Sequence, residues 1–276
     1  MKKNIRIIAL ITVLALALVS LVACKEPAGT EKAPETIKIG LTGSIYEELW
    51  NPVKETLAKE GINIELVQFT AFNLPNAALD SGEIQLNAFQ HHAYFENEKS
   101  TFGYKLTDIS DTIVIAMNLC SDKIENVDSI KDGDTILIPN DATNKGRALK
   151  LLASAGLLTL DTEIALPDVA NITSKKVDFT LVEQDASTIP QSVSDPKVAA
   201  AVVNGNYGLS FGLNPDYCIF KETEYADNSY FCLIAVREQD KDNETYKRIV
   251  EVFCSETTKQ ICEGKLGGFF VPVWDK

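Results

Sequence analysis

Residues 37–69 read IKIGLTGSIYEELWNPVKETLAKEGINIELVQF, and this stretch decides the fold class. Apolar and polar or small residues alternate over residues 37–42, which predicts a half-buried strand. Residues 44–47 then have capping-box spacing, and apolar residues at helical spacing predict a helix that stops at Gly61. A second strand follows Gly61, so the stretch predicts a β-α-β unit.

The same alternation of short helices and strands continues along the chain. Apolar runs bounded by turn residues predict strands over residues 84–89, 107–119, 135–140, 177–183, 197–203 and 229–237. Helical spacing predicts helices over residues 73–82, 146–156 and 187–193. The pattern indicates an α/β protein, and a chain that is 45% hydrophobic can form one large domain or two lobes.

The N-terminal segment indicates export. Residues 1–23 combine three basic residues with an apolar run and small residues, which is typical of a secretory signal peptide. Residues 21–24, Leu-Val-Ala-Cys, resemble the lipobox at which bacterial lipoprotein precursors are lipidated on the cysteine and cleaved, so we expect a mature chain beginning at lipidated Cys24. An uncleaved membrane anchor is the alternative, although the apolar run is shorter than the ~20 residues of a spanning helix. Residues 24–36 are polar and rich in turn residues, which predicts a flexible tether.

Charge and motifs exclude several functions. The formal charge is −13, and removing the three basic residues of the signal gives −16, which disfavours nucleic acid and an anionic bilayer surface as partners. The sequence contains no GxSxG, GxxxxGK[ST], HExxH or strand-following GxGxxG motif. We therefore expect no catalytic residues, no enzyme activity and no cofactor.

Five cysteines follow Cys24: Cys120, Cys218, Cys232, Cys254 and Cys262. Pairing among an odd number leaves at least one free, and two that lie eight residues apart on one predicted helix are too distant to bond. We expect small buried hydrophobic residues rather than a disulfide framework, although an exported protein could still oxidise a pair.

Both histidines of the chain lie in NAFQHHAYF, residues 87–95. Adjacent residues point in different directions on a helix or a strand, and the chain has no third histidine, so a metal site is disfavoured. One histidine should face the interior and the other water, but periodicity does not decide which. An ordinary core histidine is the alternative to a pocket residue.

Two further stretches suggest ligand contacts. In IPNDATNKGRALKLL, residues 138–152, either Thr143 or Asn144 is expected to cap a helix whose first turn carries Arg147. A cation at a helix start opposes the helix dipole unless a bound carboxylate lies between them, whereas a surface salt bridge is the alternative. In AAAVVNGNYGLSFG, residues 199–212, a buried strand ends at Asn204, which is either a polar ligand contact or a turn residue.

Together these stretches resemble the methionine-binding lipoproteins of the NlpA family, which are substrate receptors of ABC importers. The resemblance rests on the lipobox, FNLPNAAL, DSGEIQLNAFQHHAYF, PND-TN-GR, AVVNGNY and a final strand ending in VRE, and it spans nearly the whole chain. It implies a two-lobed periplasmic-binding-protein-like fold of type II, with the ligand cleft between the lobes. Lobe 1 would be residues 37–115, completed by 233–276, and lobe 2 residues 116–232.

The resemblance also implies roles for particular residues. Arg147 would grip the ligand carboxylate, with Asn144 nearby and Asn204 bonding the polar head. The side-chain pocket would be lined by Phe89, His91 and Tyr94, with His92 facing outward.

The resemblance places two further residues, Phe72 and Cys232, in the ligand site, and both depart from the family pattern. Phe72 stands where the family has a tyrosine before LPN, and Cys232 stands where it has an asparagine in the final strand. The expected function is a lipid-anchored receptor on the extracytoplasmic face of the cell membrane, which delivers methionine to an ABC permease and its ATPase. Because an amide is lost at Cys232, another apolar amino acid or a methionine-containing dipeptide is the alternative; a metal receptor or an adhesin is further removed.

Overall fold

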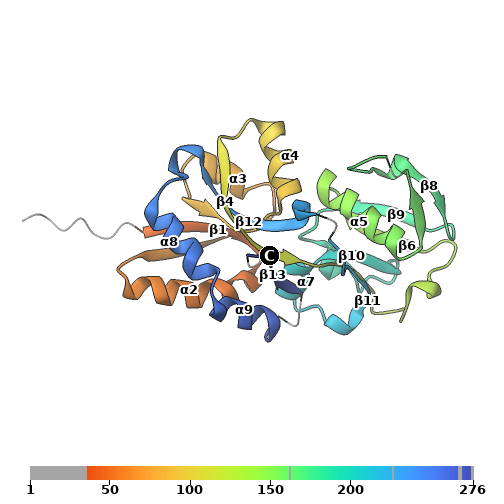
Figure 1. The fold of residues 1–276 in the computed structure, drawn as a ribbon. Coiled ribbons are helices and arrows are strands. Elements are labelled where there is room, and N and C mark those ends of the chain that lie inside the picture. Colours follow the sequence, from red (N-terminus) through yellow and green to blue (C-terminus); the bar gives the residue numbers. More distant parts are fainter. Residues whose placement is uncertain (1–35, 162, 226, 267–268, 275–276) are drawn as a thin grey trace, which may run out of the picture. The chain divides into compact units, whose positions relative to one another are not determined.

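The computed structural model describes residues 36–161, 163–225, 227–266 and 269–274, shown as a coloured ribbon in Figure 1. The predicted signal peptide, Cys24 and all but the last residue of the predicted tether lie outside these residues. Among the described helices, none has the length and apolar character needed to cross a membrane.

Two mixed sheets organise the residues from Thr36 onward (Figure 1). The first sheet has the order β13-β4-β12-β3-β1-β2. Its strands are β1 Thr36–Thr42, β2 Asn63–Phe69, β3 Leu86–Asn87, β4 Leu106–Ile115, β12 Phe231–Arg237 and β13 Phe270–Pro272. The second sheet has the order β11-β5-β10-β6-β9. Its strands are β5 Met117–Cys120, β6 Thr135–Pro139, β9 Thr180–Gln184, β10 Ala200–Asn204 and β11 Cys218–Lys221. Strands β7 Leu158–Leu160 and β8 Ile172–Lys175 form a separate pair.

Helices cover both faces of each sheet, which confirms the α/β class and the two-lobed fold. On the first sheet, α2 Glu47–Lys59, α8 Glu244–Phe253 and α9 Glu256–Glu263 pack on one face, and α3 Pro75–Asp80 and α4 His92–Phe102 on the other. On the second, α5 Ala142–Ser154 covers one face and α6 Ile189–Ser192 the other, and α7 Gly205–Phe211 follows β10 directly. We call the first sheet with its helices lobe 1 and the second lobe 2.

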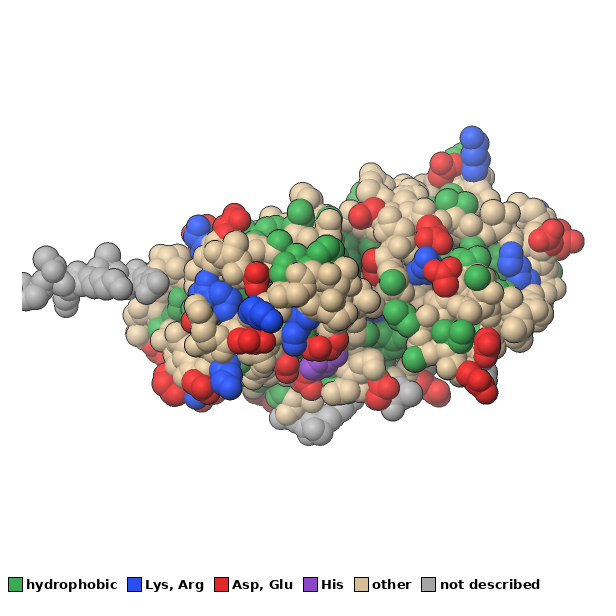
Figure 2. All heavy atoms as spheres, turned by 90° about the horizontal axis from the view of Figure 1, so that it is seen from above, with side chains coloured by type: hydrophobic (Ala, Val, Ile, Leu, Met, Phe, Trp, Pro, Cys, Tyr) green, Lys and Arg blue, Asp and Glu red, His purple; other side chains and the backbone are tan. Residues whose placement is uncertain are grey.

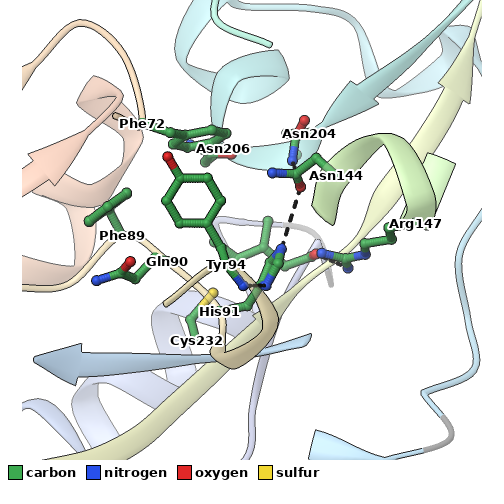
Figure 3. A pocket seen from close by; sticks show the side chains of 12 residues that line it. Phe72, Phe89, Gln90, His91, Tyr94, Asn144, Arg147, Asn204, Asn206 and Cys232 are labelled. Carbon is green, nitrogen blue, oxygen red and sulfur yellow. Dashed lines mark hydrogen bonds between the residues drawn. The ribbon is translucent and has the colours of Figure 1, made fainter. Parts of the chain in front are cut away.

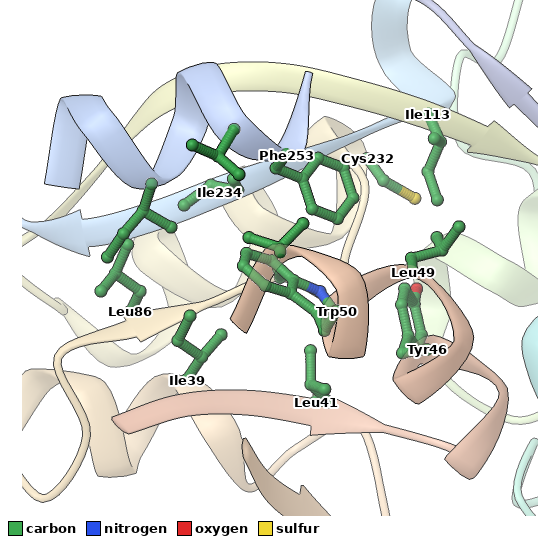
Figure 4. Close-up of a cluster of buried hydrophobic side chains, with 14 of the residues drawn as sticks. Ile39, Leu41, Tyr46, Leu49, Trp50, Leu86, Ile113, Cys232, Ile234 and Phe253 are labelled. Carbon is green, nitrogen blue, oxygen red and sulfur yellow. The ribbon is translucent and has the colours of Figure 1, made fainter. Parts of the chain in front are cut away.

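The predicted β-α-β unit is present and builds the core of lobe 1. Strand β1 pairs in parallel with β2, with Ile39 opposite Leu66. The apolar face of α2 buries Leu49, Trp50 and Val53 against the sheet, and Trp50 packs on Phe253 of α8 at a ring-centroid distance of 4.6 Å (Figure 4). The helical spacing read from the sequence is therefore the spacing of this buried stripe.

Three local predictions were wrong. Ser44 does not cap α2, because residues Ser44–Tyr46 form a 3-10 turn and the N-cap position of α2 is Tyr46, which makes no side-chain cap bond. The strand expected over residues 107–119 is two strands in different sheets, separated at Ala116. Cys254 and Cys262 do not share a helix, because α8 ends at Phe253 and α9 begins at Glu256, after the extended Ser255.

The chain crosses between the lobes twice, first at Ala116 and again between β11 and β12. The backbone of Ala116 leaves both ladders: its N–H donates to the Phe269 carbonyl at 3.0 Å and its carbonyl accepts from Gly205 N at 3.1 Å. A Cβ on Gly205 would lie 2.7 Å from that carbonyl oxygen, so the close approach of α7 to the crossing needs glycine. The return crossing ends at Phe231, two residues before the bound expected for lobe 1.

Acidic side chains are spread among basic ones over both lobes on the face shown in Figure 2, rather than gathered in one patch. This distribution agrees with a high net negative charge that serves solubility and marks no acidic binding site on that face.

Candidate functional site

A pocket lies where both lobes contribute residues (Figure 3). Its lining is Phe72, Phe89, Gln90, His91, Tyr94, Ile115, Asn144, Arg147, Asn204, Gly205, Asn206 and Cys232. All eight pocket residues expected from the sequence are in this lining. The structure thus brings them together, while their contact with a ligand stays a prediction.

Aromatic rings from lobe 1 form one wall. Phe72 follows β2, Phe89 follows β3 and Tyr94 lies in α4; their ring centroids are 5.9–6.1 Å apart. Tyr207 of α7 packs on Phe72 from lobe 2 at 4.6 Å, although no sequence pattern pointed to it. Such rings offer faces and edges to an apolar or thioether side chain.

A buried amide network fixes the segment that carries this wall. Asn76 donates to Gln90 Oε1 at 2.7 Å and accepts from Asn87 Nδ2 at 2.9 Å and Gln90 Nε2 at 2.7 Å. All three side chains are at most 3% exposed, and leaving any of their polar atoms unpaired would be costly. The amides of the two motifs NLPNAAL and NAFQHH therefore hold each other, which positions Phe89 and His91.

The two histidines serve different partners. His91 is the N-cap of α4, and its Nδ1 accepts from Tyr94 N at 3.1 Å. Nδ1 therefore carries no proton, and Nε2–H donates to Asn144 Oδ1 at 3.4 Å. Burial, together with the charge of Arg147, lowers the pKa of His91 to about 3, so the ring is neutral at physiological pH.

His92 points away from the pocket, with Nε2 2.5 Å from Asp111 Oδ1. The adjacent imidazoles thus cannot chelate one ion in this arrangement. Within the part of the chain that the structure describes, no group of three His, Cys, Asp or Glu side chains is arranged to hold a metal.

A chain of hydrogen bonds defines the orientation of both asparagines from lobe 2. The carboxylate of Asp141 accepts from Asn144 N at 2.9 Å and from Asn144 Nδ2 at 3.0–3.1 Å. Asn144 Oδ1 must then face the other way, where Asn204 Nδ2 donates to it at 2.8 Å. Asn204 Oδ1 is left buried without a hydrogen-bond partner among the described residues.

Asp141, rather than Thr143 or Asn144, caps α5. The helix begins at Ala142, so Arg147 lies in its second turn and not in the first, as the sequence had suggested. The dipole argument for a carboxylate at this cation therefore fails, because the effect fades beyond the first turn.

Arg147 is nevertheless buried and held firmly at the lobe crossings. Its Nε donates to Glu222 Oε1 at 2.9 Å, and its Nη2 donates to Glu222 Oε2 at 2.5 Å and to the Ile115 carbonyl at 2.8 Å. The Tyr230 ring centroid is 4.4 Å from its Cζ. Burial opposes the charge, but the Glu222 carboxylate outweighs it and raises the pKa of Arg147. Neither Glu222 nor Tyr230 was expected from the sequence.

Cys232 joins the pocket from β12. It bridges to the backbone of His91, and its carbonyl accepts from Thr112 Oγ1 at 2.9 Å. Burial raises the pKa of its thiol to about 12, so the sulfur is a neutral, weakly polar surface of the pocket.

The model of the NlpA lipoprotein family matches residues 37–274, which is nearly every residue of both lobes. The chain belongs to the NlpA lipoprotein family. The match includes every residue of the pocket lining.

Similar proteins of the NlpA kind include the D-methionine-binding lipoprotein MetQ of Yersinia pestis, 35% identical over 250 residues that cover 89% of this chain and 91% of that protein. A solved nutrient-binding protein from Burkholderia cenocepacia bound to methionine is 32% identical, covers 86% of this chain and 99% of its own, and has a TM-score of 0.79. The substrate-binding protein of a methionine transporter from Streptococcus pneumoniae is 34% identical, covers 87% and 96%, and has a TM-score of 0.81.

Proposed function

We propose that this NlpA-family protein is the substrate-binding subunit of an ABC importer and that its ligand is methionine. The observation that carries the proposal is Asn204, a residue of the pocket lining whose buried Oδ1 has no partner among the described residues, and three aromatic rings share that lining. Buried acceptors in proteins are almost always paired with a hydrogen-bond donor, and the ammonium group of an amino acid would supply a charged donor to Asn204 Oδ1.

The rest of an amino acid fits the remaining groups. Nε and Nη2 of Arg147 serve Glu222 and Ile115, so we assign the ligand carboxylate to Nη1, for which the described residues supply no hydrogen bond. The side chain would then lie among Phe72, Phe89 and Tyr94, whose rings suit a thioether. The methionine named for the relatives supports the same ligand.

A methionine-containing dipeptide is the second candidate, and Cys232 favours it. A thiol is smaller than the asparagine of the family pattern and bonds more weakly, so space and an unmet polar contact for a larger ligand are expected there. The glycyl-methionine dipeptide tests this directly.

The identity of the ligand is best determined by mass spectrometry of the small molecules released from the protein, purified as residues 25–276, which lack both Cys24 and the predicted signal peptide. Methionine released at nearly one molecule per chain is the expected result. A stoichiometric metal ion in place of an amino acid would mean a metal receptor, and the absence of any ligand that binds on titration would favour an adhesin.

We further propose that Cys24 carries the lipid, that residues 25–36 tether the lobes, and that the receptor works on the extracytoplasmic face of the membrane. An ABC permease with its ATPase is the partner that this placement requires. Membership in a family of lipoproteins supports the anchor.

A further inference from the structure

Cys120 and Cys218 lie opposite each other at the edge of the second sheet. Strand β11 pairs antiparallel with β5, and the two cysteines are direct partners in the register. The next residues are joined by a hydrogen bond from Ser121 N to the Tyr217 carbonyl at 2.7 Å, which fixes the strands on that side. Opposed residues of antiparallel strands have Cα atoms roughly 4.5–5.5 Å apart, within the range of roughly 4.4–6.8 Å that a disulfide spans.

The side chains already point toward each other. The two Sγ atoms are 3.2 Å apart, so bond formation requires them to approach by little more than 1 Å. Cys120 is buried and Cys218 is half-buried, and both thiols line a hollow beside Leu213 and Phe269. Neither residue lines the ligand pocket.

We propose that Cys120 and Cys218 form a disulfide in the exported protein, by exchange with a small-molecule or protein disulfide. The more exposed Cys218 loses its proton and attacks one sulfur of the external disulfide, which releases one thiolate and leaves a mixed disulfide. Cys120 then loses its proton and attacks the Cys218 sulfur, which releases the second thiolate. The two cysteines lose two protons and two electrons, and the external disulfide is reduced to two thiols.

The electrostatics agree with this order of attack. The thiol hydrogen bond between the two residues lowers the pKa of Cys218 and raises that of Cys120, so Cys218 is the thiolate former. Lys221, three residues along the same strand, also favours the anion of Cys218.

The bond would fasten β11 to β5 at the ends of the two strands that lie away from the lobe crossings. Met117 at the other end of β5 is bonded to Glu222 in both directions: Glu222 N donates to the Met117 carbonyl at 3.2 Å, and Met117 N donates to Glu222 Oε2 at 3.0 Å. Glu222 in turn holds Arg147. The disulfide thus closes a long loop and secures strand β11, which leads directly to Glu222, the partner of Arg147. The proposal rests on the export of the protein but not on the identity of its ligand.

The experiment uses the natural exported chain, extracted from membranes in detergent without reductant, alkylated after denaturation and digested for mass spectrometry. We expect a peptide pair linked through Cys120 and Cys218 that disappears on reduction. The variant Cys254→Ala, which removes a half-buried thiol of lobe 1, should keep the link; Cys218→Ala should lose it and leave Cys120 open to alkylation. Because a long loop is closed, oxidised protein should melt at least about 5 °C above the reduced form.

Two results would overturn the proposal. One is full alkylation of both thiols in the exported protein even after incubation with excess oxidised glutathione. The other is a lasting glutathione adduct on Cys218 that Cys120 never displaces. If Cys218→Ala folds poorly, the oxidised and reduced forms of the unmutated pair supply the same comparison without any substitution in lobe 2.

Discussion

Arg147 and Glu222 form a buried ion pair, and replacing them singly and together separates binding from folding. Their side chains are 4% and 11% exposed, so neither charge has much water to compensate for a lost partner. Removing one member of such a pair typically costs about 3–5 kcal/mol of unfolding free energy. We therefore expect Arg147→Gln and Glu222→Gln each to lose about that much.

The double variant Arg147→Gln/Glu222→Gln contains no buried charge at this place. The amide introduced at position 222 can still accept from Met117 N, and the two new amides can bond each other. We expect the double variant to recover most of the lost unfolding free energy. In urea unfolding, the sum of the two single losses should exceed the loss in the double variant by at least about 2 kcal/mol. A single substitution of Arg147 is for this reason a poor test of its ligand role.

Binding should follow a different pattern, measured by calorimetry with methionine. The double variant, although stable, should bind roughly ten- to hundredfold more weakly, because a charge-assisted bond to the ligand carboxylate contributes about 1.5–3 kcal/mol. Glu222→Gln keeps the arginine and should bind at least as tightly as the natural protein. Unchanged affinity in the double variant would refute the reasoning and leave Arg147 as a structural ion pair.

The remaining predictions concern three other residues. Cys232→Asn restores the family amide and should bind free methionine about tenfold more tightly, an effect of about 1.4 kcal/mol, while weakening glycyl-methionine; tighter methionine binding by the natural protein would refute this. Cys24→Ala should block palmitate labelling and precursor cleavage. Equal labelling of the variant and the natural protein would contradict the assignment of the lipid to Cys24. Because the folded-state pKa of His91 is lowered to about 3, the unfolded chain takes up a proton that the folded chain refuses as pH falls through the ordinary histidine range. The natural protein should therefore lose about 1.4 kcal/mol of unfolding free energy between about pH 7.5 and about pH 5.5. The variant His91→Asn keeps an N-cap acceptor and should not show this loss. An equal change of unfolding free energy with pH in the two proteins would contradict the lowered pKa.

Much of the fold is predictable because it depends on local patterns. The alternation over β1 and the helical stripe of α2 reflect burial on one face of each element. The break at Ala116 was missed because residues on both sides of it are buried, so the apolar run continues from one sheet into the other. What ends the strand is the pairing of the Ala116 backbone with Gly205 and Phe269, which lie far away in the sequence.

The site divides in the same way. Phe89, His91 and Tyr94 lie within one short motif, so a single resemblance selected them together. Glu222 is 75 residues from Arg147 and belongs to no motif, so the ion pair that governs the arginine could not be read from the sequence. The predicted start of α5 was wrong because the wrong residue was taken as its N-cap. Asp141 caps the helix by accepting from Asn144 N, but Thr143 and Asn144 are residue types that favour the N-cap position as well.

Titration of ligand-free protein, purified as residues 25–276, with methionine in a calorimeter tests the central claim most directly. The protein is unfolded, dialysed and refolded to remove any bound ligand, and its circular dichroism is checked against the untreated sample. We predict one methionine per chain with a Kd of about 1 μM or lower, and weak or absent binding in Asn204→Ala, which removes the buried acceptor. A folded protein that gives no heat with methionine and none with glycyl-methionine would contradict the account.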